Sequence, residues 1–337
     1  MFRFGLLGCG RIGQMHADNL SVHPRAMVSV VFDVDKEKAE IVARKHGAVS
    51  AQNAISLFSH HDLDAVIIAS ATPTHADLLE LAVSYGCPVF CEKPIDLDLK
   101  RVEKCKKAIL GSNVPIQLGF NRRFDPGHRA ARAAYRTGSI GDLHQVIISS
   151  RDPEVPPREY VSMAGGLLRD MTIHDFDLAR FMLSDEPAEI FALGNALADP
   201  DMGNDLGEID TAMIIMRTKD GKQCHINNSR SAIYGYDQRV ELVGSQGMIL
   251  SDNRKPHETK IYKRNEVESS TPYLYFFIER YAEAFMAEID AFITSIETGT
   301  LPEVGFEDGR KALLLAEAAY ISLGEKRLVQ MSEIESP

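Results

Sequence analysis

Short apolar runs alternate with amphipathic stretches of helical spacing through roughly the first 120 residues of the chain. The strand-like runs cover residues 3–7, 27–32, 63–69, 88–91 and 116–118. The run 63–69 is a continuous apolar run of the kind that is typical of a central parallel strand. The repeated strand–helix crossovers predict an α/β Rossmann domain, a doubly wound parallel sheet with right-handed connections, over residues 1–121.

The pattern changes after about residue 121, where strand-like runs are separated by turn signals. These runs cover residues 143–150, 189–193, 211–217, 223–229, 238–243 and 248–250. Their spacing predicts hairpins in one large, mainly antiparallel sheet. Helices predicted over 126–136, 168–183, 275–297 and 306–324 complete an α+β domain over residues 122–337. We expect this domain to bind substrate and to form a homo-oligomer, because a sheet face that its own helices leave uncovered needs another subunit.

A G-x-G-x-x-G segment over residues 8–13 joins the first predicted strand to the first predicted helix. Gly8 permits a tight turn, Gly10 lets the backbone approach a pyrophosphate, and Gly13 lets the helix lie close to the strand. The start of the helix then offers free N–H groups to the phosphates. In this strand–turn–helix context the segment predicts a dinucleotide-binding site.

Asp33 lies twenty residues beyond Gly13, at the end of the second predicted strand. A carboxylate there accepts hydrogen bonds from a ribose 2′-OH and repels a 2′-phosphate. Asp35 adds negative charge and no Arg or Lys immediately follows Asp33, so we predict NAD rather than NADP. Because ligands bind beyond the carboxyl ends of such strands, the loops at that edge complete the predicted site. The predicted cofactor-binding residues are Gly8, Gly10, Arg11, Ile12, Gly13, Asp33, Ser70, Ala71, Thr72, Pro73, His75, Glu92 and Lys93.

Asp170 and His174 are four residues apart in the predicted helix 168–183 and share one face of it. A histidine beside a carboxylate is a candidate general base, because the carboxylate fixes its tautomer and stabilises its charged form. The same spacing also fits a core histidine that is hydrogen-bonded to an acid in the first turn.

Lys93 stands between Glu92 and Pro94, at the predicted sheet edge that faces the nicotinamide. Pro94 restricts the backbone of Lys93 to an extended conformation. A cation there can hydrogen-bond a substrate hydroxyl and stabilise developing alkoxide charge. The alternative is a surface lysine that balances the charge of Glu92.

Composition narrows the classes of function. The net charge of −11 over 337 residues argues against nucleic acid or an anionic membrane as a partner. Five cysteines without a C-x-x-C pair favour reduced thiols and a cytoplasmic protein. We expect no signal peptide, no membrane helix and no metal site. His60 and His61 lie in a polar loop and are expected to be exposed.

Four segments together resemble the Gfo/Idh/MocA oxidoreductases. They are Gly8-Cys9-Gly10-Arg11-Ile12-Gly13, Glu92-Lys93-Pro94-Ile95, Gly119-Phe120-Asn121-Arg122-Arg123-Phe124-Asp125 and Asp170-Met171-Thr172-Ile173-His174-Asp175-Phe176-Asp177. Within that family the chain is most similar to the bacterial inositol 2-dehydrogenases, a likeness that residues 228–230 and 234–237 strengthen.

The resemblance implies a catalytic set of Lys93, Asp170 and His174. His174 would take the proton from a ring hydroxyl as hydride leaves the same carbon for the nicotinamide. Asp170 would orient His174, and Lys93 would hydrogen-bond the reacting oxygen. Weaker candidates for holding the other hydroxyls of the substrate are Asn121, Arg122, Asp152, Thr172 and Tyr234.

The reaction that the resemblance implies is NAD-dependent oxidation of a cyclic polyol. The leading case is oxidation of myo-inositol to 2-keto-myo-inositol. The enzyme is expected to be a homo-oligomer, either a tetramer or a dimer. Some inositol dehydrogenases carry a histidine near the position of residues 150–152 of this chain. This histidine is absent here, so the resemblance does not determine which polyol is selected. Two alternatives are an aldose or other sugar dehydrogenase with the same catalytic set, and a non-catalytic regulator that binds dinucleotide and sugar.

Overall fold

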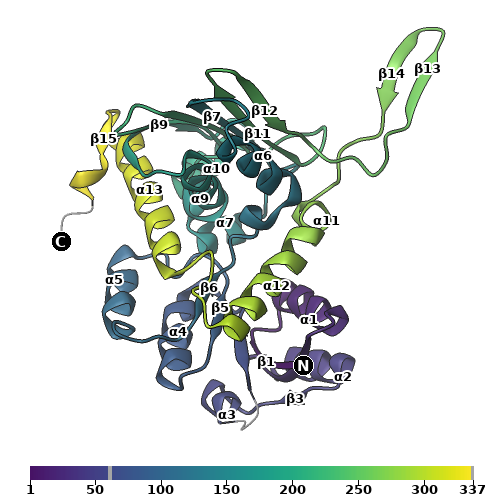
Figure 1. Cartoon of the computed structure of the whole chain (residues 1–337), viewed down its shortest axis with the longest axis vertical. Helices are drawn as coiled ribbons and strands as arrows, with labels where there is room; N and C mark the ends of the chain where they lie inside the picture. The colour runs from purple at the N-terminus through teal and green to yellow at the C-terminus, as the bar shows by residue number, and fades with distance from the viewer. Residues whose placement is uncertain (60–62, 335–337) are drawn as a thin grey trace. The chain divides into compact units, whose positions relative to one another are not determined.

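The structure, a computed structural model, describes residues 1–59 and 63–334 of the chain. The exposed position expected for His60 and His61 lies outside these residues. The chain divides into two compact units, residues 1–121 with 283–313 and residues 122–282 with 314–337, whose elements are labelled in Figure 1. None of the helices in the described part of the chain has both the length and the apolar character of a bilayer span.

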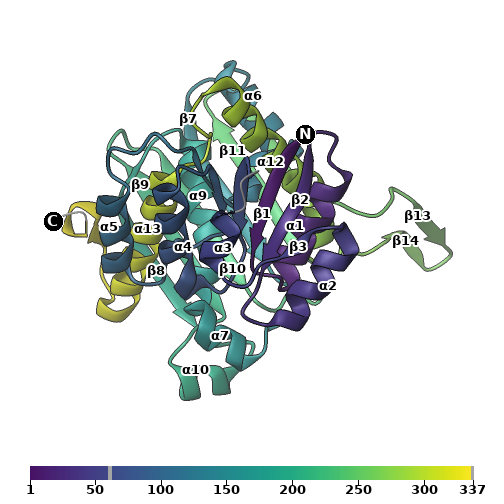
Figure 2. The ribbon, with the colours of Figure 1, turned by 90° about the horizontal axis from the view of Figure 1, so that it is seen from below.

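The first unit is built on a six-stranded parallel sheet with the order β3-β2-β1-β4-β5-β6, which is the strand order of a Rossmann fold. Figure 2 shows α1 and α2 alongside the strands of this sheet. The strands are β1 (Phe2–Leu7), β2 (Ala26–Phe32), β3 (Val49–Ser50), β4 (Ala65–Ile68), β5 (Val89–Cys91) and β6 (Ile116–Leu118). The helices are α1 (Arg11–Val22), α2 (Lys36–His46), α3 (Ala54–Phe58), η1 (Thr72–Thr74), α4 (His75–Ser84) and α5 (Leu99–Ala108).

The register of this sheet aligns the carboxyl ends of five strands. Leu7 pairs with Phe32 and with Ile68, and the row continues through Cys91 to Leu118. The residues that directly follow this row therefore share one edge of the sheet: Gly8, Asp33, Ala69, Glu92 and Gly119. This is the edge at which the sequence predicts the cofactor.

Helix α12 (Ala282–Thr298) corrects the predicted domain division, because residues 283–313 belong to the first unit. Ile289, Phe292 and Ile293 are buried in the apolar core of the parallel sheet. The Phe292 ring contacts the rings of Phe4 and Phe90. Helical periodicity indicates such a helix but not which of two sheets it covers.

The second unit contains a seven-stranded sheet with the order β12-β11-β7-β10-β9-β8-β15. Only the β7–β10 pairing in this sheet is parallel, so the sheet is mixed and mainly antiparallel. Its strands are β7 (Leu143–Arg151), β8 (Pro187–Asn195), β9 (Thr211–Thr218), β10 (Gln223–Ser229), β11 (Asp237–Gly244), β12 (Gly247–Ser251) and β15 (Val329–Gln330). Strands β13 (Lys260–Lys263) and β14 (Glu266–Ser270) form a separate hairpin.

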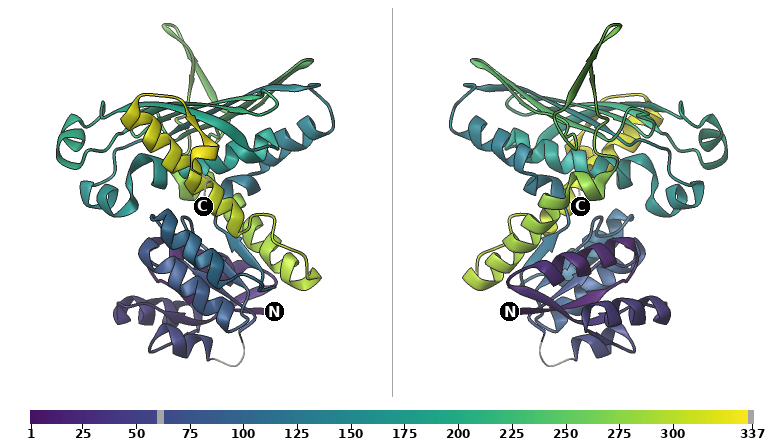
Figure 3. Two further views of the ribbon diagram at one scale, coloured as in Figure 1. Left: turned by 90° about the vertical axis from the view of Figure 1, so that its left-hand side faces the viewer. Right: turned by 90° about the vertical axis from the view of Figure 1, so that its right-hand side faces the viewer.

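Helices of the second unit cover one face of this sheet: α6 packs on β12 and β11, and α9 packs on β7 and β10. Figure 3 shows the sheet edge-on, with helices beneath it and the hairpin standing away from it. Helix η2 (Asn121–Phe124) starts at the last residue of the segment 1–121. The other helices of the second unit are α6 (Pro126–Arg136), α7 (Arg158–Ala164), α8 (Gly166–Asp170), α9 (Thr172–Leu183), α10 (Pro200–Leu206), α11 (Phe277–Arg280) and η3 (Met331–Glu333). Helix α13 (Phe306–Glu325) crosses the division between the units.

The predicted helix 168–183 is two helices, α8 and α9, that meet at Met171. The amide of His174 bonds the carbonyl of Met171 at 3.2 Å, a three-residue spacing that is tighter than an α-helical turn. Asp170 therefore ends one helix and His174 lies in the first turn of the next.

Candidate active site

The turn between β1 and α1 uses its three glycines for different reasons. Gly8 has φ +101°, and a Cβ atom there would lie 2.5 Å from the carbonyl of Ala69. A Cβ atom on Gly13 would lie 1.9 Å from the carbonyl oxygen of Gly8, so only glycine lets α1 approach the strand this closely. A Cβ atom on Gly10 would meet no heavy atom within 4 Å. The backbone at Gly10 is therefore accessible to a pyrophosphate.

Helix α1 begins directly after this turn. Its N-cap is Gly10, whose position provides no capping side chain, and its first turn holds no acidic residue. The N–H groups of the first turn carry the positive end of the helix dipole. With the accessible backbone at Gly10 they fit the phosphates of a dinucleotide.

Asp33 is held beside the glycine turn by backbone hydrogen bonds. Its Oδ2 accepts from the amide of Cys9 at 2.6 Å, and its Oδ1 accepts from the amide of Asp35 at 2.9 Å. The carboxylate thus follows β2 at the edge where a ribose attached to the pyrophosphate would lie. This position fits NAD.

The loop after β4 forms a compact turn at the same edge. The hydroxyls of Ser70 and Thr74 are 2.6 Å apart, and the Thr74 hydroxyl donates to the carbonyl of Ala71 at 2.7 Å. Ala71 and Pro73 are exposed, while Ser70 and Thr72 are half-buried. These accessible positions keep the loop available to a cofactor.

His75 differs from the other predicted cofactor residues because its side chain is only 2% exposed. Nδ1 lies 2.8 Å from the carbonyl oxygen of Pro94, and Nε2 lies 3.0 Å from that of Ser70. Burial lowers the pKa of His75 below 6.5. The ring ties the loop after β4 to the loop after β5, and the place of His75 in the cofactor site stays a prediction.

Lys93 lies in the loop after β5, between Glu92 and a cis peptide bond to Pro94. Lys93 and Glu92 are both half-buried. His16 on α1 places its Nε2 2.7 Å from Oε1 of Glu92. This contact joins the loop that carries Lys93 to the helix of the glycine turn.

His174 is the exception in a buried helix of the second unit. Of the twelve residues of α9, it alone is not buried. The neighbours of His174 in the chain, Ile173 and Asp175, are fully buried and fix the helix against the sheet. A partly exposed imidazole on a helix that is held firmly in place can exchange a proton with a bound molecule.

Asp170 accepts two hydrogen bonds that the sequence analysis did not anticipate. The Tyr160 hydroxyl donates to Oδ1 at 3.0 Å, and Arg230 donates from Nη2 to Oδ2 at 2.9 Å. Arg230 is only 2% exposed, so this is a mostly buried ion pair that fixes the carboxylate. The pairing of Asp170 with His174 stays a prediction. Arg230 lies in a segment that supports the family resemblance, but sequence spacing does not link it to Asp170.

Asp152 follows β7, and its side chain is half-buried. Burial raises the pKa of this carboxyl group from 3.8 to about 6, because desolvation and the charge of Asp170 outweigh the attraction of Arg230. Asp152, Asp170 and Arg230 thus form one electrostatic cluster. A carboxyl group with such a pKa is a functional-site candidate.

Arg122 and Thr172 were predicted to hold substrate hydroxyls but are buried in a structural network. Arg122 is ion-paired with Asp175 and bonds the hydroxyl of Ser150 at 3.1 Å. The Thr172 hydroxyl donates to Asn228 at 2.8 Å, and the Asn228 amide donates to Asp175 at 2.9 Å. Burial raises the pKa of Asp175. Arg122 is 4% exposed and Thr172 is fully buried, so these side chains fix α9 to the sheet. Their role in substrate binding stays a prediction.

The other two candidates for substrate binding have different environments. Asn121, the last residue of the first segment of the first unit, is 4% exposed. Tyr234 is 48% exposed, and its hydroxyl donates to Asp237 and accepts from Arg151, each at 2.7 Å. Tyr234 is therefore both accessible and fixed.

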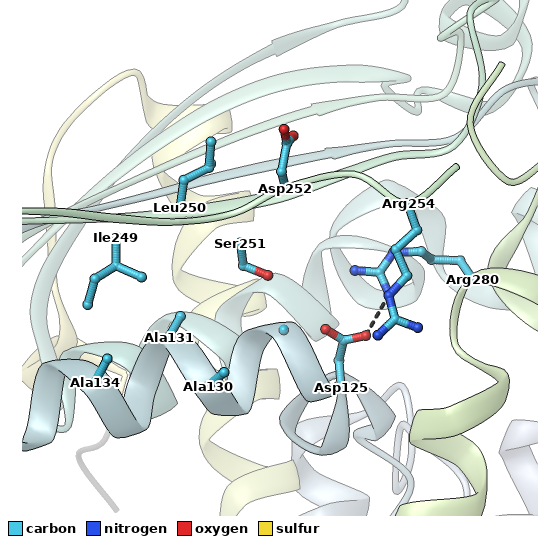
Figure 4. A pocket seen from close by; sticks show the side chains of 11 residues that line it. Asp125, Ala130, Ala131, Ala134, Ile249, Leu250, Ser251, Asp252, Arg254 and Arg280 are labelled. Atoms are coloured by element: carbon cyan, nitrogen blue, oxygen red, sulfur yellow. Dashed lines mark hydrogen bonds and ion pairs between the residues drawn. The ribbon is translucent and has the colours of Figure 1, made fainter. Parts of the chain in front are cut away.

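A pocket of about 420 Å³ lies elsewhere in the second unit, between α6 and β12 (Figure 4). Ala131 on α6 and Ile249 on β12 contribute to its apolar walls. Asp125 and Arg280 line one end and pair with each other at 2.5 Å. Its lining contains none of the residues predicted for catalysis or for substrate binding, so the pocket is separate from the candidate site.

Two family models match the chain. Residues 2–120 match the oxidoreductase family with an NAD-binding Rossmann fold, and residues 128–250 match the GFO/IDH/MocA C-terminal domain. The division between the two matches falls at the boundary between the two units near residue 121.

The chain is similar to proteins of known name along nearly its whole length. It is 44% identical to "Inositol 2-dehydrogenase" of Rhizobium meliloti (strain 1021), covering 98% of this chain and 99% of that protein. It is 40% identical to "Myo-inositol 2-dehydrogenase" of Thermotoga maritima, with the same coverage. A crystal structure of myo-inositol dehydrogenase from Lactobacillus casei, in complex with NAD(H) and myo-inositol, has a TM-score of 0.87, 26% identity and coverage of 98% of this chain and 96% of that one.

These matches agree with the parallel sheet, the glycine turn and the fixed Asp33 carboxylate of the first unit. They confirm the predicted fold, the predicted cofactor NAD and the predicted class of enzyme. The chain belongs to the Gfo/Idh/MocA family of NAD-dependent oxidoreductases.

Proposed function

We propose that this protein oxidises myo-inositol to 2-keto-myo-inositol with NAD as the hydride acceptor. The observation that carries the proposal is the partly exposed His174 on an otherwise buried helix, with the nearby Asp170 carboxylate fixed by Arg230. The names of the relatives, inositol 2-dehydrogenases at 44% and 40% identity, supply the substrate class.

His174 is the proposed general base. Oxidation of a secondary alcohol removes a proton from oxygen and a hydride from the carbon that bears it, and NAD, when bound, accepts the hydride. Neutral His174 takes the hydroxyl proton. Asp170 then stabilises the imidazolium, while Tyr160 and Arg230 hold the Asp170 carboxylate in place.

Lys93 is the proposed electrostatic partner of the reacting oxygen. Its ammonium hydrogen-bonds that oxygen and stabilises the alkoxide that develops as the proton leaves. In this mechanism Lys93 comes from the first unit, while Asp170 and His174 come from the second.

Asp152 and Tyr234 are the proposed holders of other ring hydroxyls. An ionised carboxylate accepts hydrogen bonds from two vicinal hydroxyls, and the Tyr234 hydroxyl is already oriented by Arg151 and Asp237. An inositol presents such hydroxyls all around its ring. The two side chains would thus select a polyol by its hydroxyl pattern.

We also propose that the protein is a homo-oligomer, either a tetramer or a dimer, assembled through the uncovered face of the seven-stranded sheet. One row across that face pairs Phe191, Ile215, His225 and Ile147. Ile215 is 53% exposed and its neighbour two residues away, Met213, is 59% exposed. A second copy would cover this apolar surface.

A cytoplasmic location is the accompanying proposal. All five cysteines are buried free thiols, a state that fits a reducing compartment.

The test follows NADH formation at 340 nm with myo-inositol, scyllo-inositol and common aldoses. We expect turnover with myo-inositol and at least a roughly 100-fold loss of kcat in Lys93→Met, with NAD binding retained. Turnover with aldoses but with neither inositol would show that the substrate is a sugar and not an inositol. NAD binding without turnover of any polyol or sugar would favour a non-catalytic regulator.

A further inference from the structure

Glu288 is a buried carboxyl group on α12 for which the proposed reaction has no use. It is fully buried, and neither of its side-chain oxygens has a hydrogen-bond partner in the described part of the chain. Its backbone carbonyl accepts from Nε2 of the Gln117 side chain on β6 at 2.8 Å, which fixes this turn of the helix on the parallel sheet. Burying an unpartnered carboxyl group is costly, and far more so when it is ionised than when it is neutral.

Glu288 faces two other polar side chains. A side-chain oxygen of Glu288, a ring nitrogen of His16 and an oxygen of Glu92 lie within 4.8 Å of one another. These three groups come from α12, from α1 and from the loop that carries Lys93. All three belong to the first unit.

The walls of this cluster hold Glu92 in one place. The His16 ring meets Phe90 and Phe285 edge-on, with centroids 5.2 and 6.1 Å away. On the other side, a Cβ atom on Gly119 would lie 2.9 Å from Oε2 of Glu92, so the carboxylate packs directly over the backbone there. The Glu92 carboxylate therefore lies between the His16 ring and the backbone of Gly119.

A fully buried carboxyl group this close to the half-buried Glu92 is stable only if a cation or a proton removes one of the two negative charges. The geometry disfavours a metal ion. His16 Nε2 is already engaged with Glu92 at 2.7 Å, and its Nδ1 has no partner within the described residues, whereas a metal-binding histidine donates its other N–H to an acceptor. Burial and the charge of Glu92 raise the pKa of Glu288 well above 4.5. The negative charge is therefore removed by a proton bound to Glu288.

We propose that Glu288 is a positioning residue that stays protonated at neutral pH, so that Glu92 keeps the single negative charge of the cluster and remains bonded to His16. An ionised Glu288 would repel Glu92 from His16 and shift the loop that carries Lys93. The proposal rests on the proposed function of Lys93 only for its effect on turnover. Its effect on the cofactor follows from Glu92 and the glycine-turn helix alone.

The decisive variant is Glu288→Gln in the full-length enzyme, because glutamine has the size of the neutral acid but cannot ionise. We expect this variant to bind NAD within about twofold of the wild type at pH 7. At alkaline pH we expect wild-type NAD affinity to fall as Glu288 ionises, and the Gln variant to hold its affinity. Glu283→Gln, an exposed position on the same helix, should follow the wild type at every pH.

Infrared spectroscopy gives a readout that is independent of catalysis. The wild type should show the C=O band of a protonated carboxylic acid at neutral pH, and Glu288→Gln should lose it. The proposal is overturned if that band is absent, or if the Gln variant is folded but loses NAD affinity about tenfold or more at pH 7. Failure to oxidise inositol would leave both readouts intact, so it would count against the proposed substrate and not against the role of Glu288.

Discussion

At the scale of single residues, accessibility separates the groups that can do chemistry from those that hold them. His174 reaches accessible surface, while Thr172 two residues earlier is fully buried and bonded to Asn228. Sequence spacing cannot separate the two, because both stand in the first turn of the same helix. The packing of that helix on the sheet makes the difference.

Asp152 should confer a pH dependence on substrate binding. Its pKa of about 6 means that it is protonated below that pH and ionised above it. We expect the KM for myo-inositol to rise as the pH falls through about 6, and Asp152→Asn to show a KM that is high and nearly independent of pH. Steady-state kinetics between pH 5 and pH 8 checks this. The same slope in Asp152→Asn as in the wild type would assign the dependence to another group.

The same shift predicts a change in stability. Because the pKa of Asp152 is raised in the folded state, the unfolded chain loses this proton near pH 4 and the folded protein only near pH 6. Stability therefore falls between these two pH values, and the full loss is present above about pH 6. Below pH 4 the acid is protonated in both folded and unfolded states and contributes nothing. Asp152→Asn should therefore unfold at a higher temperature than the wild type at pH 8, with the gain vanishing toward pH 4. An equal gain in unfolding temperature at pH 8 and pH 4 would contradict the raised pKa of Asp152.

Asp33 should determine the choice between NAD and NADP. Asp33→Asn keeps an oxygen for the amide of Cys9 but removes the charge that repels a 2′-phosphate. We expect the ratio of kcat/KM for NADP to that for NAD to rise by about tenfold, or about 1.4 kcal/mol. An exposed carboxylate nearby, changed in Glu37→Gln, serves as the control. An unchanged ratio in Asp33→Asn would place the selectivity elsewhere.

At the scale of elements, the glycine turn offers a matched pair of substitutions. A Cβ atom on Gly13 collides with the carbonyl of Gly8 at 1.9 Å, while one on Gly10 meets nothing within 4 Å. Gly13→Ala should lower both the melting temperature and NAD affinity, because α1 must move away from β1. Gly10→Ala should keep the melting temperature and lose NAD affinity alone. Calorimetry with and without NAD distinguishes them, and full NAD affinity in Gly10→Ala would exclude this turn from the cofactor site.

Elements whose signals are local could be predicted from the sequence. The parallel strands and the glycine turn depend on continuous apolar runs and on a short motif, and both are present where expected. The break at Met171 and the assignment of α12 to the first unit could not be predicted, because they depend on which surfaces pack together. The contacts of Asp170 with Tyr160 and Arg230 and of Asp175 with Asn228 were missed for the same reason: apart from Tyr160 they join residues more than 50 positions apart.

At the scale of the whole molecule, the uncovered sheet face should decide the state of assembly. Ile215→Glu places a charge in the middle of that face, where the side chain is 53% exposed in the single chain. We expect light scattering coupled to gel filtration to show a multiple of 37.3 kDa for the wild type and a smaller species for the variant. Leu197→Glu, at an exposed position outside the strands, should not change the mass. A wild type that is monomeric at all concentrations would rule out the proposed assembly.

Transfer of deuterium from substrate to cofactor tests the central claim most directly. The enzyme would be incubated with NAD and myo-inositol that carries deuterium at carbon 2, and the reduced cofactor would be analysed by mass spectrometry. The proposed function predicts one deuterium per reduced cofactor, together with a large loss of the rate in His174→Ala. Reduced cofactor without deuterium, or the absence of any reduction by an enzyme that binds NAD, would contradict it.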